Sequence, residues 1–228
     1  MTSSRRWAAD MPSAVQETAV EERAASAEPR PGSPMLRYLT LAMTALLLLG
    51  IGWTAATLYA GRTPGETSAE AGFARDMSRH HAQAVEMAMV AYAKGQDPAV
   101  RQIGYDIALT QQAQIGHMQR WLQEWDLLPT GSRPAMEWMP DGVTVDANGL
   151  MPGMATREEI ASLHEAQGAE VDRLFLDLMI KHHIGGVHMA DGVLDATDRP
   201  EVVRMAQSMK QGQQKEINEL RKLQQGVG

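Results

Sequence analysis

The sequence contains no cysteine, few aromatic residues and fewer basic than acidic side chains. The absence of cysteine excludes disulfide bonds, thiolate zinc sites, iron–sulfur clusters and cysteine nucleophiles, so any metal site must use histidine, methionine or carboxylate ligands. The chain has 21 Lys and Arg residues against 28 Asp and Glu residues, which gives a net charge of -7. Because a nucleic-acid-binding protein needs a basic surface to neutralise phosphates, we expect no nucleic acid among its partners.

Motifs of common enzyme classes are also missing. The sequence has no His-Glu-x-x-His, no Gly-x-Ser-x-Gly and no phosphate-binding Gly-x-x-x-x-Gly-Lys-Ser/Thr. No glutamate stands three residues before a histidine, which argues against the di-iron centre of ferritin-like oxidases. The sequence therefore indicates a protein that is not an enzyme.

The N-terminal part of the chain differs in composition from the rest. Residues 1–36 contain four prolines and almost no large aliphatic side chains, so they cannot bury enough apolar surface to offset the entropy of ordering. We predict that they form a disordered tail. No charged residue lies between Arg37 and Arg62, and at 1.5 Å per residue this stretch spans roughly 35 Å, enough for a bilayer core. We predict that residues 37–61 form a single transmembrane helix.

A cleaved signal peptide is the alternative interpretation of this apolar stretch. The segment before it is too long for the basic n-region of a signal peptide, and the stretch is longer than a typical h-region, which favours an uncleaved signal anchor. Basic residues are balanced on its two sides, so the positive-inside rule does not set the orientation. A short tail followed by a folded domain favours a cytoplasmic tail, with residues 62–228 outside the cytoplasm.

An internal duplication organises the remainder of the chain. The segment from Phe73 to His81 recurs from Phe175 to His183, and the same shift of 102 residues continues without a gap. We assign two repeats, 73–126 and 175–225, joined by a linker at 127–155 that is rich in proline and glycine. The other matched pairs are Val85/Val187, Met87/Met189, Ala88/Ala190, Pro98/Pro200, Val100/Val202, Gln111/Gln213, Gln112/Gln214 and Ile115/Ile217.

Each repeat has the pattern of a helical hairpin. Its first part places Met, His, His and Met at i, i+3, i+4 and i+10, with Ala84 or Gly186 at i+7, which is the stripe of an amphipathic helix. Pro98 and Pro200 then favour the first position of a second helix. Thr156 and Glu159 form a capping box that opens the helix leading into the second repeat, and Gly168 is expected to break or bend it. The fold class predicted is all-α, a four-helix bundle made of two duplicated hairpins and preceded by one transmembrane helix.

Histidine and methionine on these stripes suggest a metal site. Neutral imidazole suits several transition metals, whereas a thioether is soft and selects Cu(I) over hard cations, so the combination points to copper, and to Cu(I) more than Cu(II). Affinity is then expected to weaken as the pH falls through about 6.5, the ordinary pKa of histidine. The candidate ligands are His80, His81, His182, His183, Met77, Met87, Met179 and Met189.

A structural interpretation competes with the metal site. Methionine fills gaps in cores, and the histidines could be hydrogen-bonded residues of the bundle interior. His188 falls on another face of its helix and is predicted to lie at the surface, and His117 and His164 are predicted to be structural. A second group of methionines in the linker could form a soft-metal arm or pack over a bundle end, and it consists of Met136, Met139, Met151 and Met154.

The doubled pattern Phe-x-x-x-Met-x-x-His-His-x-x-x-Val-x-Met-Ala resembles domain of unknown function family 305, over about 73–223. The resemblance implies a ferritin-like four-helix bundle, and members are often exported or membrane-anchored, some of them copper-binding proteins linked to copper tolerance. It also implies the ligand role for the eight His and Met residues. Many relatives have an acidic residue after the second His pair, where this chain has Ile184, Gly185 and Gly186, so that carboxylate is absent.

Two functional hypotheses follow. The first is a membrane-anchored, extracytoplasmic protein that binds copper through His and Met and buffers, sequesters or hands on the ion to a metal-handling partner. The alternative is a structural or protein-interaction ectodomain whose His and Met residues form only its core.

Overall fold

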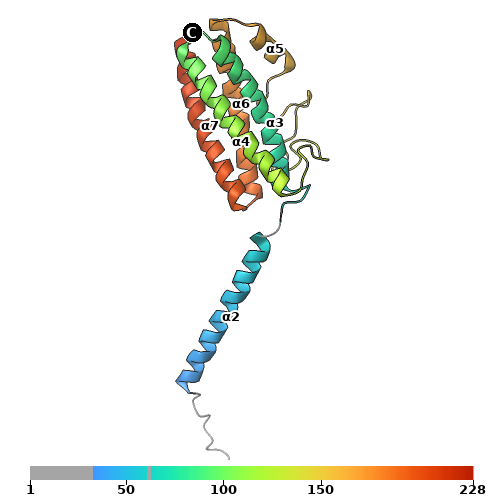
Figure 1. Cartoon of the computed structure of the whole chain (residues 1–228), viewed down its shortest axis with the longest axis vertical. Helices are drawn as coiled ribbons and strands as arrows, with labels where there is room; N and C mark the ends of the chain where they lie inside the picture. Colours follow the sequence, from blue (N-terminus) through green and yellow to red (C-terminus); the bar gives the residue numbers. More distant parts are fainter. Residues whose placement is uncertain (1–32, 61–62, 228) are drawn as a thin grey trace, which may run out of the picture. The chain divides into compact units, whose positions relative to one another are not determined.

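The computed structural model describes residues 33–60 and 63–227, and these residues form six helices and no strand (Figure 1). Most of the predicted tail lies outside the described residues. Residues 34–36, which we assigned to that tail, belong to the first helix instead, because Pro34 suits the first helical turn. The helices are α2 (Pro34–Ala60), α3 (Ala69–Lys94), α4 (Pro98–Glu124), α5 (Arg157–Glu165), α6 (Ala169–Ala196) and α7 (Pro200–Val227).

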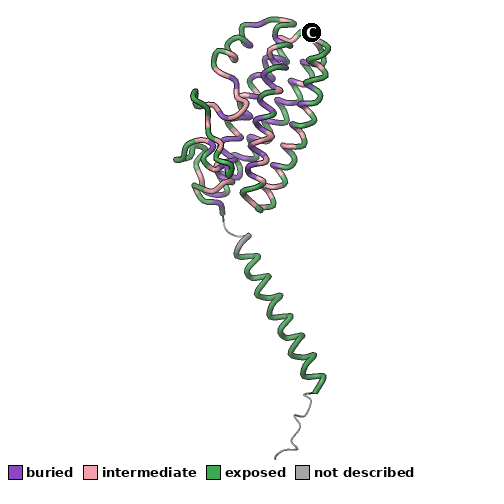
Figure 2. The backbone as a smooth tube through the Cα atoms, turned by 180° about the vertical axis from the view of Figure 1, so that it is seen from behind, coloured by how far each residue is buried: buried purple, intermediate pink, exposed green. Residues whose placement is uncertain are grey.

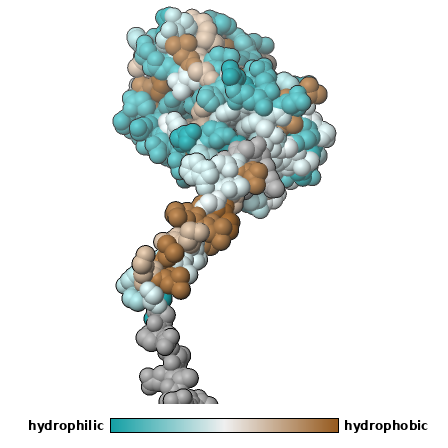
Figure 3. All heavy atoms as spheres, turned by 60° about the horizontal axis from the view of Figure 1, so that its bottom comes forward, coloured by the Kyte–Doolittle hydropathy of each residue, from teal (hydrophilic) through white to brown (hydrophobic). Residues whose placement is uncertain are grey.

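Helix α2 forms a unit separate from the other helices. It is the one helix in the described residues that is long and apolar enough, by length and composition, to cross a membrane, over Pro34–Leu58. Its apolar side chains are exposed, and Figure 3 shows the hydrophobic surface they make. Four threonine hydroxyls donate to backbone carbonyls three or four residues earlier, so their polar groups are satisfied within the helix.

Helices α3 to α7 form the second unit, in which the hairpins α3–α4 and α6–α7 pack through α3 and α6 (Figure 1). Two carboxylates, one from each hairpin, form hydrogen bonds to the opposite hairpin. Asp172 of α6 accepts hydrogen bonds from the backbone N–H groups of Gln96 (3.0 Å) and Asp97 (2.8 Å) in the α3–α4 turn. Glu70 of α3 accepts one from the hydroxyl of Thr197 after α6 (2.6 Å). Because each carboxylate stands at the start of one helix and reaches the end of the other, α3 and α6 run antiparallel.

The predicted all-α class and four-helix bundle are therefore confirmed. The residues coloured as buried in Figure 2 lie along the facing sides of the helices, and the apolar ones form two clusters. One cluster contains Phe73 with Met77 and Met189, and the other contains Phe175 with Met87 and Met179. The antiparallel arrangement thus pairs the beginning of each stripe with the end of its duplicate.

The connection between the hairpins is irregular from Leu127 to Ala155. Thr156 opens α5 with the capping box expected, its side chain accepting from the Glu159 N–H (3.1 Å) while the Glu159 carboxylate accepts from the Thr156 N–H (2.7 Å). Helix α5 ends at Glu165, and Gly168 adopts a φ of 57° before α6 begins. Gly168 therefore separates two helices, because this left-handed conformation favours glycine.

Candidate metal centre

The two histidine doublets meet where α3 packs against α6. The ring centroids of His80 and His182 are 3.8 Å apart, and within the doublets the ring centroids of His80 and His81 lie 6.5 Å apart and those of His182 and His183 lie 6.4 Å apart. All four side chains are buried, with at most 1% of any residue exposed. The duplication therefore brings four imidazoles into one layer at the middle of the bundle.

In three of these imidazoles the Nε2 atom makes a hydrogen bond with an oxygen atom of another segment. The Nε2 atom of His80 lies 3.0 Å from the carbonyl oxygen of Pro152 in the linker. The Nε2 atom of His81 lies 2.7 Å from the amide oxygen of Gln114 on α4, and that of His183 lies 2.7 Å from the carboxylate of Glu216 on α7. In contrast, His182 makes no hydrogen bond of normal geometry with the described residues.

Burial keeps the rings of His80, His81 and His182 neutral. Loss of solvation lowers the pKa of His80 to about 4 and that of His81 to about 3, and it holds the pKa of His182 well below its ordinary value. A metal binds the neutral imidazole, so these side chains need no deprotonation at neutral pH. The expectation that protons compete with a metal from about pH 6.5 is therefore wrong for His80 and His81 in the folded protein, and their competition moves to about pH 4 and below.

Several nitrogens of this layer have no partner. Within the described residues, the Nδ1 atoms of all four histidines and the Nε2 atom of His182 are buried without a hydrogen bond. A buried polar atom without a partner costs about 1–3 kcal/mol, so a purely structural core would be penalised at each of them. Neutral, unpartnered imidazole nitrogens are the donors that a copper ion uses, and the chemistry of this donor set fits the metal.

The four stripe methionines lie on the two sides of the histidine layer, and all are fully buried. Met77 and Met179 each precede their own histidine doublet by one helical turn, about 4.5 Å along the axis. Met87 and Met189 follow their doublets by roughly 10 Å, about two turns. Along its own helix, each of Met77 and Met179 is therefore closer to its histidine doublet than Met87 or Met189 is.

The linker methionines pack into the bundle. Met136, Met139 and Met151 are buried in the apolar cluster that contains Met77 and Met189, and Met154 is partly buried against the same cluster. Gly192 on α6 makes room for one of them, because a Cβ atom there would stand 2.4 Å from the Met139 sulfur. These methionines therefore contribute to the apolar core beside α3 and α6.

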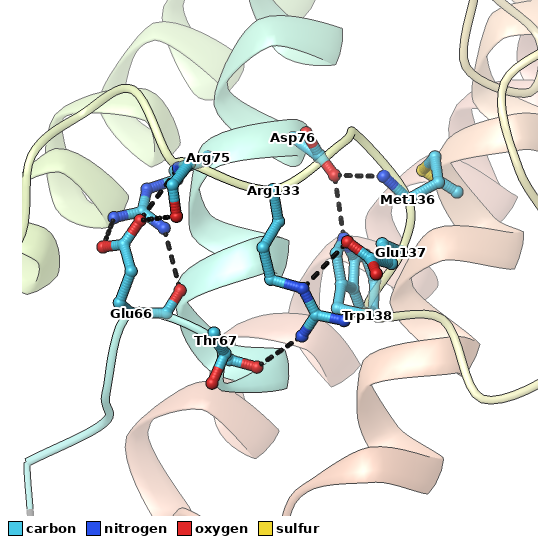
Figure 4. Close-up of polar contacts among 9 residues, drawn as sticks. Glu66, Thr67, Arg75, Asp76, Arg133, Met136, Glu137 and Trp138 are labelled. Carbon is cyan, nitrogen blue, oxygen red and sulfur yellow. Dashed lines mark hydrogen bonds and ion pairs between the residues drawn. The ribbon is translucent and has the colours of Figure 1, made fainter.

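The linker is fastened to the first turns of α3. The buried carboxylate of Asp76 accepts hydrogen bonds from the Met136 N–H (2.7 Å) and from the indole N–H of Trp138 (2.9 Å), as Figure 4 shows. Burial raises the pKa of Asp76 against the opposing effect of these two bonds. Beside it, Arg75 donates to the carboxylate of Glu66 (2.6 Å). These contacts fix the position from which the linker continues across the histidine layer.

A second set of contacts closes the linker over His80 and His182. Gln83 of α3 donates to the Ala155 carbonyl (2.9 Å) and accepts from the Ala155 N–H (2.8 Å). On α6, a Cβ atom at Gly185 would lie 1.9 Å from the Pro152 carbonyl oxygen, so the missing side chain is what lets that carbonyl come close. Gly185 therefore admits the linker backbone against α6.

The remaining histidines lie at the surface. The Nε2 atom of His188 lies 2.7 Å from the carboxylate of Asp141, that of His164 lies 2.9 Å from Glu86, and the ring of His117 stands edge-on to Trp121. Within the described residues, no group of three or more His, Asp and Glu side chains is arranged to hold a metal ion as the structure stands. The imidazole layer is the candidate centre because of its buried, unpartnered nitrogens and not because a metal-binding geometry is already formed.

Sequence reasoning missed Gln114 and Glu216. Both lie 33 residues after the second histidine of their repeat, so the duplication relates them to each other. This equal separation was the available sequence signal. It was missed because the two equivalent positions hold different residues, a glutamine in the first repeat and a glutamate in the second. Glu216 also supplies, from another helix, a carboxylate beside the second doublet that the residues after His183 do not provide.

Known proteins support the architecture. The family model described as Domain of unknown function (DUF305) matches residues 70–224. A DUF305 protein from Streptomyces coelicolor is 40% identical, with a TM-score of 0.65 over 72% of this chain and 95% of that chain. A DUF305 fragment from Deinococcus radiodurans is 32% identical, with a TM-score of 0.58 over 68% and 95% of the two chains.

A third solved structure is CopM in its Cu(II)-bound form, 28% identical with a TM-score of 0.56 over 70% of this chain and 97% of that chain. CopM is also known in Cu(I)-bound, Ag-bound and apo forms. Among curated proteins, none matches the chain. The family model covers more than half of the sequence, and the chain belongs to the DUF305 family.

Proposed function

We propose that the bundle binds copper at the histidine layer between α3 and α6. The imidazoles of His80, His81, His182 and His183 are the nitrogen donors, and Met77 and Met179 are the nearest sulfur donors. The observation that carries this proposal is the set of buried imidazole nitrogens that have no hydrogen-bond partner in the described structure. The copper-bound and silver-bound forms of CopM, a structural neighbour, support the same class of ligand.

The donor set favours Cu(I) over Cu(II). Thioether sulfur is a soft ligand, and a site that combines it with neutral imidazole in a dry interior suits the softer, singly charged ion. Met87 and Met189 stay in the proposed set as sulfurs further along each stripe. The linker methionines place further sulfurs in the cluster that contains Met77, and we retain them as a proposed secondary site.

The proposed role is storage or transfer of the ion outside the cytoplasm. Helix α2 would anchor the chain in the lipid bilayer as a single-pass signal anchor at residues 37–61, and the bundle at 62–228, with its repeats 73–126 and 175–225, would face away from the cytoplasm. A site without cysteine suits an oxidising compartment, where thiolates are lost to disulfides. The lack of enzyme motifs favours a protein that buffers, sequesters or hands copper to a metal-handling partner without catalysis.

The alternative, a structural or protein-interaction ectodomain with a His and Met core, also has an observation in its favour. The rings of His80 and His182 stack at 3.8 Å, and no ready-made group of three His, Asp or Glu side chains exists in the described residues. Binding of copper would then be incidental.

Anaerobic titration of the full chain with Cu(I) against a competing chelator separates the two functions. We expect tight binding by the wild type and an affinity at least about 100-fold weaker when all four histidines become leucine, because several ligands are lost at once. Leucine keeps apolar volume that alanine would leave empty. The matched control replaces the surface residues His117, His164 and His188, and it should bind as the wild type does. Equal affinity in the four-leucine variant, with its helical circular dichroism intact, would favour the structural ectodomain.

A further inference from the structure

The hydrogen bonds at the histidine layer specify which ring nitrogen carries the proton. The Pro152 carbonyl and the Glu216 carboxylate have only lone pairs to offer, so the Nε2 atoms of His80 and His183 must be the donors. The amide oxygen of Gln114 accepts from Nε2 of His81 in the same way. An imidazole in its neutral form has a single N–H, so in that form the lone pair of each of these three rings lies on Nδ1.

Those Nδ1 atoms are the ones without partners. In the described part of the chain, Nδ1 of His80, His81 and His183 is buried and makes no hydrogen bond. The Nε2 atom of each ring is thus hydrogen-bonded to an oxygen from the linker, α4 or α7, while the buried Nδ1 atom keeps its lone pair unused. Metal-binding histidines commonly have this arrangement, in which one nitrogen ligates and the other donates to a carbonyl or carboxylate.

We infer that His80, His81 and His183 each offer Nδ1, and not Nε2, to a soft monovalent cation, and that the Pro152 carbonyl, Gln114 and Glu216 are positioning groups that keep the proton on Nε2. This inference rests on the proposed copper function and names the ligating atoms of that site. Neither ring nitrogen of His182 makes a hydrogen bond of normal geometry with the described residues, so the same assignment does not extend to that ring.

The positioning groups make the two repeats unequal. Gln114 and Glu216 occupy equivalent places in the duplication, yet Glu216 alone is a carboxylate. A carboxylate that accepts a hydrogen bond from an imidazole makes the ring a more basic ligand, so Glu216 should make His183 a stronger donor than Gln114 makes His81. Glu216 is only about a quarter exposed, so solvent screens its charge incompletely.

Nitrogen NMR of the full chain in detergent micelles, with ¹⁵N-labelled histidine, tests the assignment. Ag(I) is the probe, because it is a soft monovalent ion and diamagnetic. Before metal is added, His80, His81 and His183 should show the Nε2–H tautomer. On addition of Ag(I), their Nδ1 resonances should shift while the Nε2 protons remain. Loss of the Nε2 protons with a shift of the Nε2 resonances would overturn the inference but leave metal binding in place. No change at any ring would overturn the proposed function itself.

Two exchanges test the positioning role of Glu216. In Glu216→Gln the amide oxygen still accepts from Nε2, so the tautomer of His183 should stay unchanged while Ag(I) affinity falls about tenfold, the lower end of the effect of outer-shell changes. The matched variant Gln114→Glu should raise the affinity by a similar factor. A merely structural Glu216 would give wild-type affinity in Glu216→Gln, and that result would overturn its assigned role.

Discussion

The metal-free protein is expected to lose stability steeply between pH 6.5 and pH 4. The pKa of His80 is about 4, that of His81 is about 3, and that of His182 is also well below 6.5, whereas each titrates near 6.5 in the unfolded chain. Between pH 6.5 and the folded pKa values, the unfolded state therefore binds protons at these histidines that the folded state does not bind. The stability these neutral rings provide is complete above pH 6.5 and is lost as the pH falls toward the folded pKa values.

The expected size of this effect is large. Each such histidine contributes a slope of about 1.4 kcal/mol per pH unit, so three give roughly 4 kcal/mol per unit. A domain with a typical stability of about 5–15 kcal/mol would therefore unfold within a few pH units of neutrality. Asp76 acts in the opposite direction, because its pKa is raised in the folded state and its protonation in acid favours the fold.

Urea unfolding of the chelator-treated protein, followed by circular dichroism at a series of pH values, measures this slope. The double variant His80→Leu with His182→Leu should lose about two-thirds of it, since two of the three titrating rings are gone. A slope that is equally steep in the double variant would assign acid sensitivity to other groups and refute the account of the buried rings.

Gly185→Ala is expected to destabilise the protein by about 3 kcal/mol or more. The added Cβ atom would lie 1.9 Å from the carbonyl oxygen and 2.4 Å from the carbonyl carbon of Pro152, and both are backbone atoms that no side-chain rotation can move. The linker must then withdraw from α6. Because the same carbonyl accepts the hydrogen bond of His80, the withdrawal should also leave the Nε2 atom of that ring without its partner.

The control for this substitution is Gly212→Ala on α7, where an added Cβ atom meets nothing within 4 Å. Alanine is the better helix former there, so this variant should be stabilised by up to about 1 kcal/mol. Chemical denaturation of both variants gives the comparison. Equal stability of Gly185→Ala and the wild type would mean that the linker does not lie against α6 as the structure has it.

The duplication made much of this fold predictable from the sequence. A stripe of Met, His, His, a small residue and Met at helical spacing has one apolar face, and two copies of it must bury that face against each other. Pro98 and Pro200 marked the starts of the second helices, and the Thr156 capping box marked α5, because these residues act on the backbone nearest to them. Local signals of this kind can be recognised in the sequence without knowledge of the tertiary structure.

The partners of the histidines were not predictable in the same way. The Pro152 carbonyl reaches His80 from 72 residues away, and it does so because Gly185 and Gln83 let an irregular segment settle on α3 and α6. An irregular segment of this kind has no periodic sequence pattern, so its sequence indicates only a proline-rich and glycine-rich linker. The linker methionines were ambiguous for the same reason, and only their burial with Met77 shows where they pack.

X-ray absorption of the full chain loaded with Cu(I) under anaerobic conditions tests the central claim most directly. The account predicts nitrogen and sulfur neighbours around the ion, with the outer-shell scattering that imidazole rings produce, and the loss of that scattering when the four histidines of the layer become leucine. Copper bound without any imidazole scattering in the wild type, or with the same spectrum in the four-leucine variant, would contradict it.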